Sequence, residues 1–125
     1  MSFVVDTSVL IDYLRGHLGA ADALESARRG DRLIASEMTR VEVLAGMRGG
    51  EERLTRALLS ALEWRILDEE TSEVAGELGR RWLPSHHTID GADLVIAATT
   101  IVASARLLTR NVKHFPMFDG LRPPY

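Results

Sequence analysis

Apolar residues recur along the chain at two spacings, and the two spacings alternate. Short continuous apolar runs are typical of buried strands, whereas apolar positions that recur every three to four residues are typical of helices. The runs predict strands at residues 3–5, 32–36, 64–68 and 106–110. The helical spacing predicts helices at residues 6–16, 20–30, 39–50, 51–62, 69–83 and 93–105. Several of these predicted helices end at glycine, which is a common helix stop.

Strands that alternate with helices predict a parallel sheet with helices on both faces. We therefore expect an α/β fold, a three-layer α/β/α sandwich around a central, mainly parallel sheet. The length of 125 residues fits one domain, residues 1–125. The Pro-rich segment 115–125 could add a last edge strand. Parallel sheets of this kind bind ligands beyond the carboxyl ends of their strands, so the residues that follow each strand are the first candidates for chemistry.

The composition is that of an ordinary globular protein, with 46% hydrophobic residues, 26% charged residues and a formal net charge of −3. Arginine far outnumbers lysine, which reflects either genome base composition or a need for bidentate phosphate contact. The lack of cysteine excludes disulfides, zinc–thiolate sites and cysteine nucleophiles. The start of the chain has no signal-peptide pattern, and the longest apolar stretch, residues 94–105, is too short for a membrane span. We therefore expect a cytoplasmic protein.

Four polar residues from separate segments lie at or near the predicted strand ends: Asp6, Glu42, Asp93 and Asn111. Each has a purely structural alternative. Asp6 could cap the first helix, and Thr39 with Glu42 matches the S/T-x-x-E capping box. Asp90 and Asp93 could both stabilise a helix N-terminus, and an asparagine after a strand is a common turn residue. No single position requires a catalytic role.

Three acids and one amide at one rim of a sheet change that interpretation. Clustered carboxylates repel one another unless a cation lies between them, and oxygen-only ligands suit Mg²⁺ or Mn²⁺. Magnesium sites typically combine one or two carboxylates with waters and a substrate phosphate. The pattern therefore indicates a magnesium centre and phosphoryl chemistry, in which the metal activates water and offsets charge in the transition state.

Three stretches resemble the PIN-domain ribonucleases in their order and spacing. They are VVDTSVLIDYLRG, ASEMTRVEVLAGMRGG and IDGADLVIAATTIVASARLLTRNVKHF. The likeness is strongest to the VapC toxins of type II VapBC toxin–antitoxin pairs, and it covers residues 4–115. It implies the compact PIN fold and a Mg²⁺-dependent endoribonuclease that cleaves RNA phosphodiester bonds by metal-activated water.

The resemblance also implies roles for single residues. Asp6, Glu42 and Asp93 match the metal-binding acids, and Asn111 falls on the fourth catalytic position, where many relatives carry aspartate. Asparagine supplies an oxygen but no charge. We therefore expect one well-held Mg²⁺, with any second ion recruited by the substrate phosphate. Asp90 lies outside the main family pattern, and we expect it to cap a helix or to support a metal ligand.

Further polar side chains are expected to support the acids or the substrate. The hydroxyls that could orient the carboxylates or the attacking water belong to Thr7, Ser8 and Thr109. Arg110 and Lys113 follow the last predicted strand and are candidates for contact with the substrate phosphate. A solvated loop explains these two residues equally well. His114 is either a surface histidine or a substrate contact.

VapC-like toxins are usually dimers and are inhibited by a cognate VapB antitoxin, which commonly places an arginine in the acidic site. Electrostatics supports this, because three clustered acids attract a guanidinium as well as a metal. The resemblance therefore implies as partners an RNA substrate (tRNA, rRNA or mRNA), a VapB-like antitoxin, a second copy of the chain and a larger assembly with the antitoxin. No membrane partner is expected.

Two other classes of protein remain as alternatives. The first is a non-catalytic PIN-like module that binds RNA or protein; Asn111 is its best support, and the three retained acids argue against it. The second is a receiver-type phosphoacceptor domain, which needs a pair of acids after the first strand. The sequence VVDTS has a single acid there, which excludes this second alternative.

Overall fold

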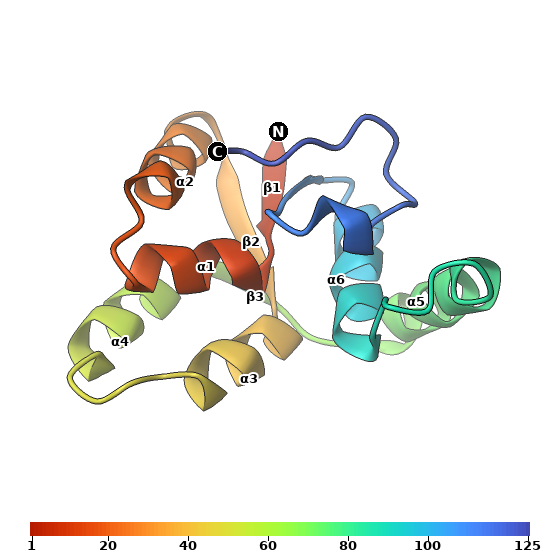
Figure 1. The fold of residues 1–125 in the computed structure, drawn as a ribbon, viewed down its shortest axis with the longest axis horizontal. Coiled ribbons are helices and arrows are strands. Elements are labelled where there is room, and N and C mark those ends of the chain that lie inside the picture. The colour runs from red at the N-terminus through yellow and green to blue at the C-terminus, as the bar shows by residue number, and fades with distance from the viewer.

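The computed structural model describes residues 1–125 and shows a parallel four-stranded sheet between two layers of helices (Figure 1). The strands are β1 (Ser2–Val5), β2 (Arg32–Ser36), β3 (Glu63–Arg65) and β4 (Arg106–Leu108), in the order β3-β2-β1-β4. The helices are α1 (Thr7–Leu14), α2 (Leu18–Gly30), α3 (Glu37–Ala45), α4 (Glu52–Ser60), α5 (Glu69–Trp82), α6 (Gly91–Val102) and the short 3-10 helix η1 (Val112–His114). The predicted α/β/α sandwich is confirmed.

Alternation along the strands divides the core between the two faces of the sheet. Val5 and Leu33 face one side, where they pack with buried residues of α1 to α4. Val4 and Ile34 face the other side, where they pack against Ile96 of α6. Figure 1 shows the same division, with α1 to α4 on one side of the sheet and α5 and α6 on the other. Each fully buried Val, Leu or Ile stabilises the fold by roughly 1.5–3 kcal/mol.

The helix predicted at residues 39–50 differs most from the structure. Helix α3 begins at Glu37 because the Ser36 side chain accepts a hydrogen bond from the backbone N–H of Met38 and caps the helix. It ends at Ala45, and the backbone N–H of Gly46 bonds to the carbonyl of Glu42. Thr39 therefore lies inside the helix and caps nothing.

The segment 115–125 adds no strand to the sheet, so the expected last edge strand was wrong. Prolines 116, 123 and 124 lack the N–H that a strand ladder requires. Instead the segment runs back across the molecule toward α1 and α2 (Figure 1). Strands β3 and β4 are also shorter than their predicted runs, with three residues each. None of the helices combines the length and apolar character that membrane crossing requires.

The order of the strands places a topological switch beside β1. The chain adds β2 and β3 on one side of β1 and then crosses over to place β4 on the other side. In open α/β sheets, ligands bind where the strand order reverses in this way. Asp6 directly follows β1 and Thr109 directly follows β4, so both lie at the switch.

Candidate metal centre

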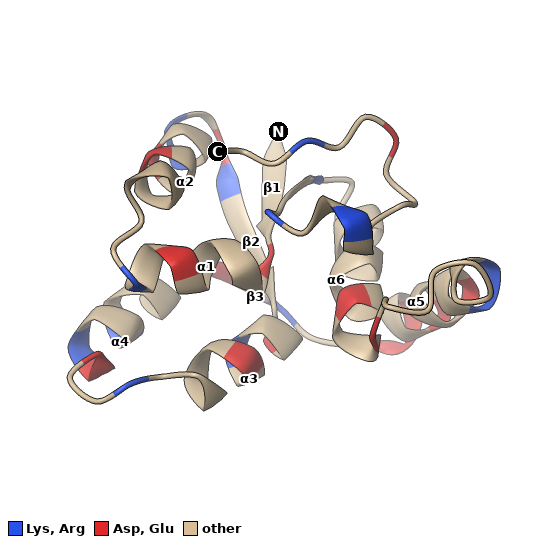
Figure 2. Ribbon diagram, in the orientation of Figure 1, with Lys and Arg blue, Asp and Glu red and all other residues tan.

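A cavity of about 450 Å³ lies beyond the carboxyl ends of β1 and β4, and only one of its lining residues is apolar. Its lining consists of Asp6, Thr7, Ser8, Ile11, Asp12, Glu42, Asp90, Asp93, Arg110, Asn111 and His114. Figure 2 shows acidic segments on α1, α3 and α6, the three helices that surround this region. The four residues predicted from the strand ends therefore share one cavity, although they come from four separate parts of the chain.

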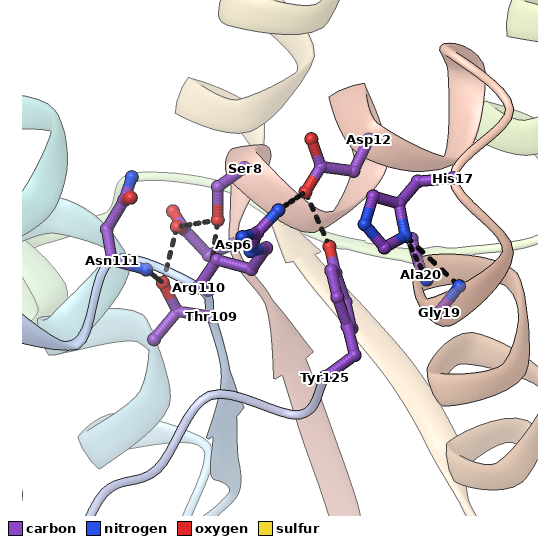
Figure 3. Close-up of polar contacts among 10 residues, drawn as sticks. All are labelled: Asp6, Ser8, Asp12, His17, Gly19, Ala20, Thr109, Arg110, Asn111 and Tyr125. Atoms are coloured by element: carbon purple, nitrogen blue, oxygen red, sulfur yellow. Dashed lines mark hydrogen bonds and ion pairs between the residues drawn. The ribbon is translucent and has the colours of Figure 1, made fainter.

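Asp6 occupies the N-cap position of α1, but its side chain makes no capping hydrogen bond. Instead, Oδ2 accepts hydrogen bonds from the hydroxyls of Ser8 and Thr109, both at 2.7 Å (Figure 3). The side chain is almost fully buried, with 4% exposed. Burial of a carboxylate is costly unless it is hydrogen-bonded or paired. The capping interpretation of Asp6 is therefore wrong for the side chain, which is held in place by two hydroxyls.

Glu42 lies in the second turn of α3 and makes no bond to the start of its own helix, so the capping-box interpretation was wrong. Its Oε1 accepts a hydrogen bond of 2.7 Å from the Thr7 hydroxyl on α1. The Thr7 hydroxyl also lies 3.1 Å from that of Thr39, which is fully buried beneath it. Thr7 thus connects the start of α1 to the acid of α3.

Asp90 and Asp93 form a capping box at the start of α6. Asp90 Oδ1 accepts from the backbone N–H of Asp93 at 2.8 Å, and Asp93 Oδ2 accepts from that of Asp90 at 3.1 Å. Asp93 Oδ2 also lies 3.1 Å from Nδ1 of His114. Burial raises the pKa of Asp93 to about 6, and the charge of Asp90 adds to the rise, although the backbone hydrogen bond and His114 oppose it. The structure therefore assigns Asp90 a capping role and brings His114 to the acid.

The residues after β4 separate into two groups. Arg110, Asn111 and His114 line the cavity, whereas Lys113 is exposed and does not. Asn111 is held by its backbone N–H, which donates to the Thr109 hydroxyl at 2.9 Å, and its amide makes no hydrogen bond to the protein. Lys113 makes no ion pair, and nothing in the structure supports the prediction that it contacts the substrate phosphate at this cavity.

Sequence reasoning missed Asp12, which also lines the cavity. Its Oδ2 accepts hydrogen bonds from Arg110 Nη1 at 3.0 Å and from the Tyr125 hydroxyl at 2.8 Å. Burial alone would raise the pKa of Asp12, but these two hydrogen bonds outweigh it and lower the pKa. Asp12 follows Ser8 by four residues, a spacing that puts both on one face of α1 and could have indicated the placement. No local pattern indicates Tyr125.

Each of the three acids uses one oxygen for contacts with the protein and keeps the other without a hydrogen bond. The engaged atoms are Asp6 Oδ2, Glu42 Oε1 and Asp93 Oδ2. No three acidic or histidine side chains approach closely enough to hold one ion by themselves. This arrangement fits Mg²⁺ or Mn²⁺, because such ions are commonly bound by one or two carboxylates and complete their coordination with water and phosphate. It does not fit a site built on nitrogen or sulfur ligands.

We expect Thr109→Val to weaken Mg²⁺ binding about tenfold, because valine keeps the shape of threonine but removes the donor that orients Asp6. Isothermal titration calorimetry measures the change. Thr100→Val is the matched control, since Thr100 is equally buried but donates only to the Ile96 carbonyl of its own helix. Unchanged Mg²⁺ affinity in Thr109→Val would contradict the orienting role.

This chain is similar to known proteins in both sequence and fold. The PIN domain family matches residues 3–119. Ribonuclease VapC19 of Mycobacterium tuberculosis is 46% identical over 123 residues, which cover 98% of either chain. Ribonuclease VapC10 of the same organism is 41% identical over 122 residues, covering 98% of this chain and 92% of the relative. Among solved structures, a toxin–antitoxin complex from Klebsiella pneumoniae has a TM-score of 0.83 at 28% identity, covering 98% of this chain and 97% of the other.

The fold and the cavity define an α/β protein with clustered acids at the switch point of a parallel sheet. The chain belongs to the PIN-domain family and, within it, to the VapC toxins. The family predicted from the three sequence stretches is therefore confirmed.

Proposed function

We propose that this chain is the toxin of a toxin–antitoxin pair, an Mg²⁺-dependent endoribonuclease that hydrolyses RNA phosphodiester bonds. The observation that carries the proposal is the shared cavity, in which Asp6, Glu42 and Asp93 each keep one carboxylate oxygen without a hydrogen bond. The relatives at 46% and 41% identity are named ribonucleases, which supports the same reaction for this chain.

Each part of the site has a separate task in this proposal. Mg²⁺, or Mn²⁺ in its place, supplies the positive charge that activates water and offsets the charge of the transition state. Of Asp6, Glu42 and Asp93, one or two would bind the ion directly through oxygen and the rest through water, and the hydroxyls that fix Asp6 and Glu42 limit the rotation of these two acids. Arg110 lies at the edge of the cavity and contacts the substrate phosphate.

Asn111 makes the ligand set less negative than four acids would be. Its amide oxygen can ligate an ion or orient a water, but it adds no charge. We therefore propose one firmly bound Mg²⁺, with a second ion arriving together with the RNA phosphate.

We further propose that a VapB-like antitoxin inhibits the chain and that the chain forms homodimers. Two solved structures with similar folds are described as VapBC2 from Rickettsia felis and VapBC from Salmonella typhimurium. The acidic cavity accepts an arginine from a partner by charge alone, which explains how an antitoxin blocks metal and substrate together.

Cleavage of labelled RNA with and without metal tests the proposed reaction. The purified chain is expected to cut RNA in Mg²⁺, to stop in EDTA, and to recover when Mg²⁺ or Mn²⁺ is added in excess. A preparation that binds RNA but never cuts it in either metal would favour the alternative of a non-catalytic binding module.

A further inference from the structure

Tyr125 is seated against α1 and the start of α2, far in sequence from both (Figure 3). Its hydroxyl donates to Asp12 Oδ2 at 2.8 Å, and its ring centroid lies 4.8 Å from that of His17. A Cβ added at Gly19 would lie 2.9 Å from Tyr125 Cβ, closer than real Cβ contacts allow. Burial and the bond to Asp12 raise the pKa of Tyr125, so its hydroxyl stays protonated and donates. These contacts fix the position of the Tyr125 ring.

Arg110 is held by the same group of residues. Its Nη1 donates to Asp12 Oδ2 at 3.0 Å, and its guanidinium carbon lies 5.0 Å from the centre of the Tyr125 ring. Its backbone N–H donates to the Ser8 hydroxyl at 3.3 Å, next to Asp6. One carboxylate oxygen of Asp12 thus binds both the arginine and the tyrosine, and Figure 3 shows the three side chains meeting at that atom.

This arrangement restrains a cation that would otherwise be drawn to the metal-site acids. Arg110 and the acids line the same cavity, and an unrestrained guanidinium pairs readily with carboxylates. Asp12 uses Nη1 alone, whereas a guanidinium has five N–H donors. The side chain is 42% exposed, so its remaining donors are accessible to a ligand at the rim.

We propose that Asp12 and Tyr125 are positioning residues, which hold Arg110 at the rim of the cavity to bind a phosphate of the RNA. The inference rests on the proposed ribonuclease function and adds two residues to it. Asp12 fixes the guanidinium through a charged hydrogen bond, and Tyr125 fixes both Asp12 and the face of the guanidinium. Neither touches the RNA in this arrangement.

A double-mutant cycle separates this role from a merely structural ion pair. Asp12→Asn and Arg110→Ala are each expected to raise the KM for RNA about tenfold and to change kcat less than twofold, since a charged hydrogen bond is lost at a binding contact. The double variant should match Arg110→Ala, because Asp12 acts through the arginine. Tyr125→Phe, which keeps the ring and loses the hydroxyl, should raise KM about threefold. Equal effects of Asp12→Asn with and without Arg110 would overturn the proposal.

RNA binding in EDTA gives a second readout that needs no cleavage. Anisotropy of a labelled single-stranded RNA should show the same pattern of affinities, and Arg110→Ala should reduce the slope of log Kd against log salt by about 0.7, the value for one phosphate contact. Glu63→Gln is the matched control, since Glu63 pairs with Arg32 on the neighbouring strand, outside the cavity; its affinity should equal that of the wild type. An unchanged salt slope in Arg110→Ala would contradict the phosphate contact.

The two assays distinguish failure of the positioning role from failure of the ribonuclease function. If the wild type cuts RNA but the effects of Asp12→Asn and Arg110→Ala on KM are additive, the positioning role is wrong and the ribonuclease function stands. If the wild type binds RNA and the double variant matches Arg110→Ala in affinity, but the wild type does not cut RNA, the ribonuclease function is wrong. Arg110 then remains a phosphate contact that Asp12 holds in place. Thermal unfolding of each variant identifies any that lose affinity through misfolding, and Tyr125→Phe then carries the test as the mildest change.

Discussion

Asp6→Asn is expected to lower the rate of RNA cleavage about a thousandfold, which corresponds to about 4 kcal/mol of transition-state stabilisation. Asparagine has the same shape, so its oxygen can keep the hydrogen bonds from Ser8 and Thr109. Its NH₂ group then replaces the oxygen that has no partner, and an amide NH₂ cannot bind a metal. The loss comes from the metal site and not from the fold. Initial rates on a labelled RNA at saturating Mg²⁺ measure it.

Asp119→Asn is the matched control for this prediction. Asp119 is exposed and does not line the acidic cavity, so its variant should cut RNA at the wild-type rate. The two variants should also have the same thermal midpoint within a few degrees. Full activity in Asp6→Asn would show that the assigned cavity is not where the reaction occurs.

Asp93→Asn is expected to have two effects of opposite sign. Cleavage should fall about a hundredfold or more, because a carboxylate is removed from the proposed ligand set. The metal-free protein, in contrast, should become more stable at pH 7.5 by roughly 1–3 kcal/mol. The reason is that Asp93 is buried, with 8% exposed, and its ionised form is disfavoured in the fold without a cation.

The pH dependence follows from the raised pKa of Asp93, which is about 6 in the folded protein against 3.8 as its ordinary value. The stability that this carboxyl contributes in its protonated form is complete below about pH 4 and is lost as the pH rises through about 6. The stability difference between Asp93→Asn and wild type should therefore be small near pH 4 and full at pH 7.5. Urea unfolding in EDTA at both pH values measures it, with Asp119→Asn as the unaffected reference. A destabilised Asp93→Asn at pH 7.5 would contradict the argument.

The layers of the fold could be predicted from the sequence because periodicity reports which residues are buried. The parallel strands at Val4, Ile34 and Leu107 are short apolar runs, and the structure buries all three. Helix boundaries were less predictable where two capping signals compete. Ser36 and Thr39 are both residue types that cap helices. Ser36 is the residue that caps α3 because β2 ends there, and the local sequence does not determine that end point.

The acids of the site could be predicted in part, because strand ends in a parallel sheet converge. The hydrogen bonds that these acids accept from other parts of the protein could not be predicted. Asp6 looked like a helix cap, yet its hydrogen bonds come from Ser8 and from Thr109, which is 103 residues away. The spacing from Ser8 could indicate which face of α1 Asp12 occupies, but no sequence pattern indicates its partner Tyr125, which is 113 residues away.

The bond between Asp6 and Thr109 has a consequence for the time at which activity appears. Contacts between residues this far apart form late in folding, since closing a long loop loses chain entropy before the contact can compensate for it. Thr109 reaches Asp6 only after β4 has joined the edge of β1. A nascent chain with its first hundred residues folded has Asp6, Glu42 and Asp93, but Asp6 then has the hydrogen bond from Ser8 without the one from Thr109. We expect the proposed nuclease activity to appear only with the completed fold, because Thr109, Arg110 and Asn111 all lie beyond these residues in the chain.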